Sequence, residues 1–130
     1  MKRAVVYYSR SGNTKAVAEA IAQASAAKAV SADDPAAKIT EPVDFLFVGG
    51  ALYFHGIDKN LKAFLEALPE GAAKKAAVFS TSWISKHAID VIKDALKAKN
   101  IPVIEDALYI KKTPDAAGIR KAETFAAKYI

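Results

Sequence analysis

Short apolar runs alternate with helical patterns along the whole chain, and this alternation most constrains the fold. The apolar runs predict five strands, at residues 4–8, 28–31, 44–49, 75–80 and 102–110. Apolar spacings of three and four residues predict helices at 14–28, 58–68, 85–99 and 115–129, with a short helix or turn at 33–38. Strands that alternate with helices form a parallel sheet covered on both faces. We therefore expect an α/β fold with a doubly wound five-stranded parallel sheet.

The helical patterns also predict which helix residues enter the core. Each helix carries one apolar stripe, which should face the sheet because that burial stabilises an amphipathic helix. The predicted inward residues of the first three helices are Val17, Ala18, Ile21, Leu61, Phe64, Leu65, Leu68, Ala88, Val91, Ile92 and Leu96.

Length and composition fit one compact domain over residues 1–130, because 52% of the residues are hydrophobic and 25% are charged. The absence of cysteine excludes a disulfide scaffold, a thiolate nucleophile and a cysteine-ligated metal. The apolar run after Lys2 and Arg3 is shorter than the roughly 7–15 residues of a secretory signal or the roughly 20 of a membrane span. We expect a cytoplasmic protein without membrane insertion.

The first loop at the carboxyl end of the predicted sheet, "SRSGNT" at residues 9–14, has the composition of an anion site. Ligands of doubly wound sheets bind at these strand ends. Serine and threonine hydroxyls, backbone N–H groups and the positive end of the following helix favour a phosphate, and Gly12 allows close approach. Ordinary helix capping is the alternative. Neither a Walker loop nor a G-x-G-x-x-G fingerprint occurs.

Two further loops at the same edge bring aromatic side chains. "GGALYFHG" at 49–56 contains Tyr53 and Phe54, and "STSWIS" at 80–85 contains Trp83, the only tryptophan. These rings either return to the core or present flat faces to a planar ligand. A phosphate site beside flat aromatic faces describes a mononucleotide site.

The segment "VVYYSRSGNT" at 5–14, followed by Ala18 and Ile21, resembles the signature of the flavodoxin family. The resemblance implies a three-layer sandwich with strand order 2-1-3-4-5 and FMN at the point where the order reverses. The chain resembles the short kind of flavodoxin, since it lacks room for an insertion in the fifth strand.

By that resemblance, three segments would bind FMN. The phosphate would lie on Ser9, Arg10, Ser11, Gly12, Asn13 and Thr14, with Thr14 also at the helix start. One face of the ring would lie along Gly50, Ala51, Leu52, Tyr53 and Phe54. The ribityl chain and the other face would lie along Ser80, Thr81, Ser82 and Trp83. Trp83 and Tyr53 are the favoured stacking rings, and Gly49, Gly50 and Gly56 would let a peptide reorient with redox state.

The implied function is electron transfer through a tightly bound flavin, which requires no catalytic side chain and no metal. A flavoenzyme on the same fold, a quinone reductase or a protoporphyrinogen oxidase, is the alternative. A phosphorelay receiver domain would need acidic residues where Tyr8, Ser9, Gly49 and Gly50 stand. A nucleic-acid-binding module without flavin would be colourless and would bind DNA in a strongly salt-dependent way.

The net charge of +5 departs from the acidic flavodoxins of the familiar kind. Because charge governs partners rather than fold, we expect the redox partner proteins to be acidic. The lysines are scattered, without a dense tract, so we expect no nucleic-acid partner and a monomer.

Replacing Trp83 with alanine should weaken FMN binding by about 1 kcal/mol or more, because a stacked aromatic ring contributes beyond its buried area. A fluorescence titration of the apoprotein measures this, and an unchanged dissociation constant would remove Trp83 from the site.

Overall fold

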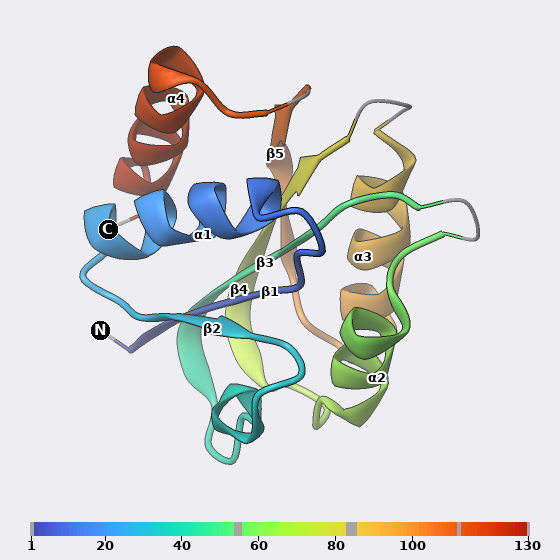
Figure 1. The fold of residues 1–130 in the computed structure, drawn as a ribbon. Coiled ribbons are helices and arrows are strands. Elements are labelled where there is room, and N and C mark those ends of the chain that lie inside the picture. The colour runs from blue at the N-terminus through green and yellow to red at the C-terminus, as the bar shows by residue number, and fades with distance from the viewer. Residues whose placement is uncertain (1, 54–55, 83–85, 112, 130) are drawn as a thin grey trace.

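The computed structural model describes residues 2–53, 56–82, 86–111 and 113–129. Strands and helices alternate along these parts of the chain (Figure 1). In order they are β1 (Arg3–Tyr7), α1 (Asn13–Ala24), β2 (Ala29–Ser31), the 3₁₀ turn η1 (Pro35–Ala37), β3 (Val43–Gly50), α2 (Lys59–Ala67), β4 (Ala73–Thr81), α3 (His87–Lys97), β5 (Val103–Ile110) and α4 (Ala116–Ala127).

The five strands form one parallel sheet in the order β2-β1-β3-β4-β5. This confirms the doubly wound α/β fold and the strand order implied by the resemblance. The register pairs Tyr7 with Gly49, Gly50 with Ser80, and Thr81 with Ile110. The carboxyl ends of β1, β3, β4 and β5 therefore meet at one edge, where the three predicted ligand loops begin.

Helices cover both faces of the sheet, α1 and α4 on one side and α2 and α3 on the other (Figure 1). The α1/α4 layer packs Val17, Ile21 and Phe125 against the apolar side chains of one sheet face. The α2/α3 layer packs Leu61 and Ile92 against the other face. Two apolar layers fix the sheet between them and leave its carboxyl edge to the loops.

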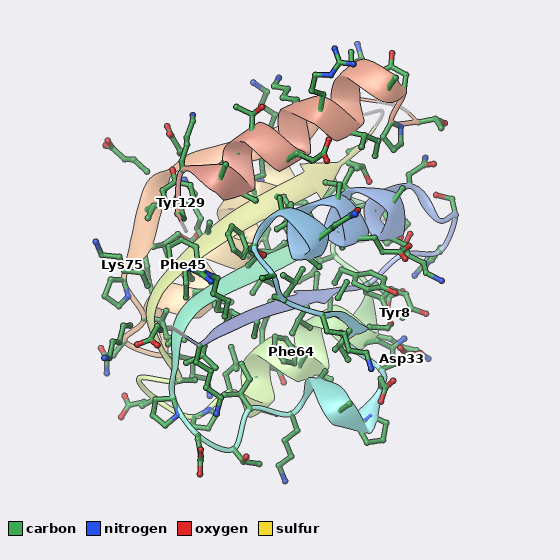
Figure 2. The ribbon with its side chains drawn as sticks, turned by 90° about the vertical axis from the view of Figure 1, so that its left-hand side faces the viewer. Tyr8, Asp33, Phe45, Phe64, Lys75 and Tyr129 are labelled. Carbon is green, nitrogen blue, oxygen red and sulfur yellow. The ribbon has the colours of Figure 1, made fainter. Side chains whose placement is uncertain are left out.

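Aromatic rings cluster near the amino end of the sheet, on the face covered by α1 and α4. Phe45 and Tyr129 stack with their centroids 5.2 Å apart, and Phe125 lies edge-on to Tyr129 at 5.5 Å. Figure 2 shows Phe45 and Tyr129 together at the end of the sheet opposite Tyr8, which follows β1. The polar loops and this aromatic cluster therefore lie at opposite ends of the strands.

Helix α1 ends at Ala24, four residues before the predicted end at residue 28. The Ala26 amide donates to the Gln23 carbonyl and the Ala27 amide to that of Ala22, which is a Schellman ending. Ala26 takes the left-handed φ of 54° that this ending requires. Because glycine usually fills that position and alanine does not signal it, the helix end was predicted too late.

Most residues of the predicted helical stripes are buried, with one correction in α3. Val91 is only half-buried, whereas Ile89 is 7% exposed and belongs to the core. Both positions are compatible with the apolar spacing, and the rotation of α3 on the sheet decides between them.

Replacing Ala26 with glycine should raise the free energy of unfolding by about 1 kcal/mol, because only the left-handed strain of an exposed alanine is removed. Ala63→Gly, an exposed position inside α2, should lower the free energy of unfolding by about 1 kcal/mol. Urea unfolding measures both, and equal effects of the two substitutions would contradict the strain at Ala26.

Candidate functional site

The loop between β1 and α1 leaves the start of the helix open to an anion. The Gly12 amide donates to Ser9 Oγ at 3.0 Å, and Gly12 is the N-cap of α1. No side chain caps α1 and no acidic residue lies in its first turn. Helix α3 also lacks a side-chain cap but has Asp90 in its first turn, whereas Asp58 caps α2 and Asp115 caps α4. Because the first amides of a helix need acceptors and carry positive partial charge, the start of α1 can bind an anionic group.

Gly12 has a backbone that few other residues adopt. Its φ is 92°, and a Cβ built on it would meet no heavy atom within 4 Å. The requirement for glycine is therefore conformational, and the neighbouring space is open. An open space beside the first turn of α1 fits the phosphate predicted for this loop.

Hydroxyl groups connect this loop to the end of β4. Thr14 Oγ1 and Thr81 Oγ1 lie 2.6 Å apart, and both residues are buried. Ser80 is fully buried, and its Oγ has no hydrogen-bond partner in the described part of the chain. A buried hydroxyl without a partner is costly. Ser80 Oγ is thus an unused polar group at the edge where the ribityl chain is expected.

In the second loop Tyr53 and Gly56 are paired by two backbone hydrogen bonds. The Tyr53 amide donates to the Gly56 carbonyl at 2.7 Å, and the Gly56 amide donates back at 3.0 Å. The guanidinium carbon of Arg10 lies 3.9 Å from the centre of the Tyr53 ring, and the Arg10 amide donates to the Tyr53 hydroxyl at 3.3 Å. Burial raises the pKa of Tyr53 and outweighs the opposite effect of the Arg10 amide and guanidinium.

Gly49 and Gly50 lie at the end of β3 and are closely packed. Both are buried in β3, and a Cβ at Gly49 would overlap the Phe79 ring, while one at Gly50 would overlap Leu61. Close packing therefore favours glycine at both positions, and the reorientation of a peptide with redox state stays a prediction. Gly56, with φ of 109°, is the glycine of this loop whose backbone needs the left-handed region.

Asp58 joins the first loop to the start of α2. Its Oδ2 accepts from Arg10 Nη2 at 2.7 Å and Nε at 2.9 Å, and its Oδ1 accepts from the Asn60 amide at 2.8 Å. Burial alone would raise the pKa of Asp58, but the bonds from the Asn60 amide, Arg10 and the Asn60 side chain outweigh it and lower the pKa. Sequence patterns do not reveal this role, because an aspartate before a helix suggests only an N-cap.

Tyr109 is a second residue of the edge that the sequence did not single out. Its hydroxyl donates to the Ser82 carbonyl at 2.7 Å, and Lys86 Nζ lies 5.4 Å from the centre of its ring. Tyr109 therefore holds the start of the third loop from the neighbouring strand. Its position near the end of β5 was the available signal, since β5 pairs with β4 there.

The structure brings most of the predicted site residues to one edge. Ser9 to Thr14, Gly50 to Tyr53, and Ser80 to Ser82 lie at or just beyond the carboxyl ends of β1, β3 and β4. Phe54 and Trp83 lie outside the described residues. The choice of Trp83 and Tyr53 as stacking rings stays a prediction.

Grooves elsewhere on the described surface have other compositions. One of about 480 Å³ lies between β5 and α4 and includes Arg120 and Phe125. Another of about 510 Å³ lies between the η1 segment and α2 and is largely apolar. Within the described ranges, no helix is both long and apolar enough to cross a membrane, and no three His, Asp or Glu residues are grouped to hold a metal ion.

The strand order defines a doubly wound α/β protein, and polar loops lie at the carboxyl edge of its sheet, where such folds bind ligands. The model of the flavodoxin domain family matches residues 4–123. The chain therefore belongs to the flavodoxin domain family and is a flavodoxin-type flavin-binding protein.

Solved structures show the same fold. A flavodoxin from the domain Archaea superposes with a TM-score of 0.86 at 24% identity, over 98% of this chain and 95% of that chain. Oxidised flavodoxin 1 from Bacillus cereus gives 0.82 at 25% identity, over 100% and 99%. Rubredoxin oxygen:oxidoreductase from Desulfovibrio gigas gives 0.81 at 17% identity, over 97% of this chain but 34% of that longer chain. A search of curated protein sequences found no match.

The lowered pKa of Asp58 predicts an acid-sensitive fold. Because the folded pKa lies below the unfolded value of about 3.9, this stabilisation is complete above about pH 5 and is lost as the pH falls through the folded pKa. Asp58→Asn should lower the free energy of unfolding at pH 7 by about 1 kcal/mol. It should also lose less stability than the wild type between pH 6 and pH 3. Urea unfolding across this range measures both, and parallel pH profiles would contradict the assignment.

Proposed function

We propose that this protein binds FMN at the carboxyl edge of its sheet and carries electrons between partner proteins. The observation that carries the proposal is the start of α1, which has neither a side-chain cap nor an acidic residue in its first turn and opens beside Gly12. A dianionic phosphate supplies the acceptors and the negative charge that such a helix start favours.

Different residues of the chain bind the phosphate, the ribityl chain and the ring of FMN. Backbone amides and hydroxyls of residues 9–14 hold the phosphate, and the bond between Thr14 and Thr81 holds this loop against β4. The buried, unpartnered hydroxyl of Ser80 and its neighbours Thr81 and Ser82 bind the ribityl chain. Tyr53, with Gly50, Ala51, Leu52 and Phe54, forms one wall of the ring site, and Trp83 forms the other.

When bound, FMN supplies the redox chemistry. The protein orients the ring, excludes water from part of it and tunes its surroundings, which is all that an electron carrier requires. Turnover separates this function from the flavoenzyme alternative. A carrier reduces other redox proteins but shows no sustained turnover with quinones, whereas a quinone reductase does.

The partner we propose is an acidic redox protein. The net charge is +5, and Lys15, Lys59 and Lys86 are exposed at the starts of the three helices that border the site. Acidic side chains at the same edge include Asp58, which accepts from Arg10, and Asp115, which accepts from the Gly118 amide. Asp33 and Asp34, just after β2, are exposed and accept from Ser31 Oγ and the Ala36 amide. Opposite charge on a partner would steer it to this edge.

The purified protein should be yellow, and its apoprotein should bind FMN. Gly12→Val should weaken FMN binding at least tenfold, because a branched side chain enters the open space and strains the left-handed backbone. Titration of the apoprotein followed by flavin fluorescence gives the dissociation constant.

Gly71→Val is the matched control, since Gly71 also has a left-handed φ, of 67°, and open space around it but lies between α2 and β4, at the far end of the sheet. It should lose similar stability and keep its affinity for FMN. Normal FMN binding by Gly12→Val would show that residues 9–14 do not hold the phosphate.

A further inference from the structure

Arg10 stands in the phosphate loop, but its side chain is directed elsewhere. Both Nε and Nη2 donate to Asp58 Oδ2, at 2.9 and 2.7 Å. The Arg10 side chain is 55% exposed, whereas that of Asp58 is 5% exposed. Arg10 is the only cationic side chain in the loop expected to hold phosphate. It is instead hydrogen-bonded to a buried carboxylate 48 residues further along the chain.

Asp58 needs this partner. Its Oδ1 accepts from the Asn60 amide at 2.8 Å and from Asn60 Nδ2 at 3.0 Å, so the Arg10 bonds supply the donors of the other oxygen. If Arg10 turned towards a phosphate, a buried carboxylate oxygen would lose both of these donors. Such a loss is costly for a buried charge, and the geometry therefore favours a guanidinium that stays on Asp58.

In that position Arg10 fixes the Tyr53 ring at two points. The guanidinium lies over one face of the ring at 3.9 Å, and the Arg10 amide donates to the hydroxyl at 3.3 Å. Two backbone hydrogen bonds to Gly56 also hold the main chain of Tyr53. The guanidinium therefore covers one face of the Tyr53 ring, so a flat ligand that stacks on Tyr53 would have to use the opposite face.

We propose that Arg10 is a positioning residue for the flavin ring: its side chain, anchored on Asp58, holds Tyr53 as a wall of the site and does not bind the phosphate. This inference rests on the proposed FMN function and deepens it. It assigns the Arg10 side chain to recognition of the tricyclic ring, although its backbone lies in the loop that holds the phosphate.

Riboflavin, which has the same ring and no phosphate, separates the two roles. The dissociation constant of riboflavin divided by that of FMN reports the phosphate contribution alone. Loss of a residue that positions the ring raises both constants by the same factor and leaves the ratio unchanged. Loss of a charged phosphate ligand weakens FMN binding selectively, because a guanidinium–phosphate contact is a strong charge-assisted bond.

The experiment titrates apoprotein variants with both flavins. Arg10→Gln should raise both dissociation constants about tenfold and leave their ratio within twofold of the wild type. Asp58→Asn keeps an N-cap side chain but removes the charged anchor, and should act in the same direction on both flavins. Arg10→Lys keeps the positive charge but lacks the planar guanidinium donors. Its affinity for both flavins should lie between those of Arg10→Gln and the wild type.

Two control variants are titrated with the same flavins for comparison. Lys15→Gln removes one exposed positive charge from the first turn of α1, and should leave riboflavin binding within twofold of the wild type. Gly12→Val should lower the ratio of the riboflavin to the FMN dissociation constant, because it weakens binding of the phosphate, which only FMN carries. Without any flavin, amide hydrogen exchange at Tyr53 and Gly56 should be faster in Arg10→Gln than in the wild type.

Distinct results overturn the inference and the proposed function. If the ratio of the riboflavin to the FMN dissociation constant fell tenfold or more in Arg10→Gln, the Arg10 side chain would be shown to bind the phosphate. Unchanged riboflavin binding in both Arg10→Gln and Asp58→Asn, or unchanged hydrogen exchange at Tyr53 and Gly56, would remove the positioning role. Wild-type protein that bound neither flavin would instead overturn the proposed function itself.

Discussion

Parallel pairing of β1, β3 and β4 is the constraint on which the rest of the structure depends. Their register sets Tyr7 beside Gly49 and Gly50 beside Ser80, so loops from distant parts of the sequence begin at one edge. The packing behind this edge is tight. Phe79 and Leu61 occupy the space that side chains at Gly49 and Gly50 would need. Because the core fixes the strand ends closely, short polar contacts between the loops become possible.

Those contacts join the three loops at one edge of the sheet. Thr14 meets Thr81 across the first and third loops, while Arg10 meets Tyr53 and Asp58 across the first loop, the second loop and α2. Buried polar groups stabilise a unique arrangement only when each has a partner. Asp58 is satisfied on both oxygens, whereas the buried Ser80 Oγ has no hydrogen-bond partner in the described part of the chain.

Much of this architecture was predictable from sequence patterns. The apolar runs located every strand, and the resemblance of residues 5–21 supplied the strand order that the sheet confirms. Local patterns failed where the deciding contact is not local. Helix α1 ends early at an alanine with left-handed backbone, and the rotation of α3 buries Ile89 instead of Val91. The packing role of Gly49 and Gly50 depends on Phe79 and Leu61, which lie on other elements.

The sequence by itself determined the alternation of strands and helices, the family, and the composition of the three loops, because periodicity and turn chemistry are local properties of the chain. Only the tertiary structure decided what each loop side chain contacts. Arg10 and Asp58 are 48 residues apart, and Thr14 and Thr81 are 67 apart. No spacing along the chain encodes these contacts, since they arise only when parallel strands in register bring their carboxyl ends together.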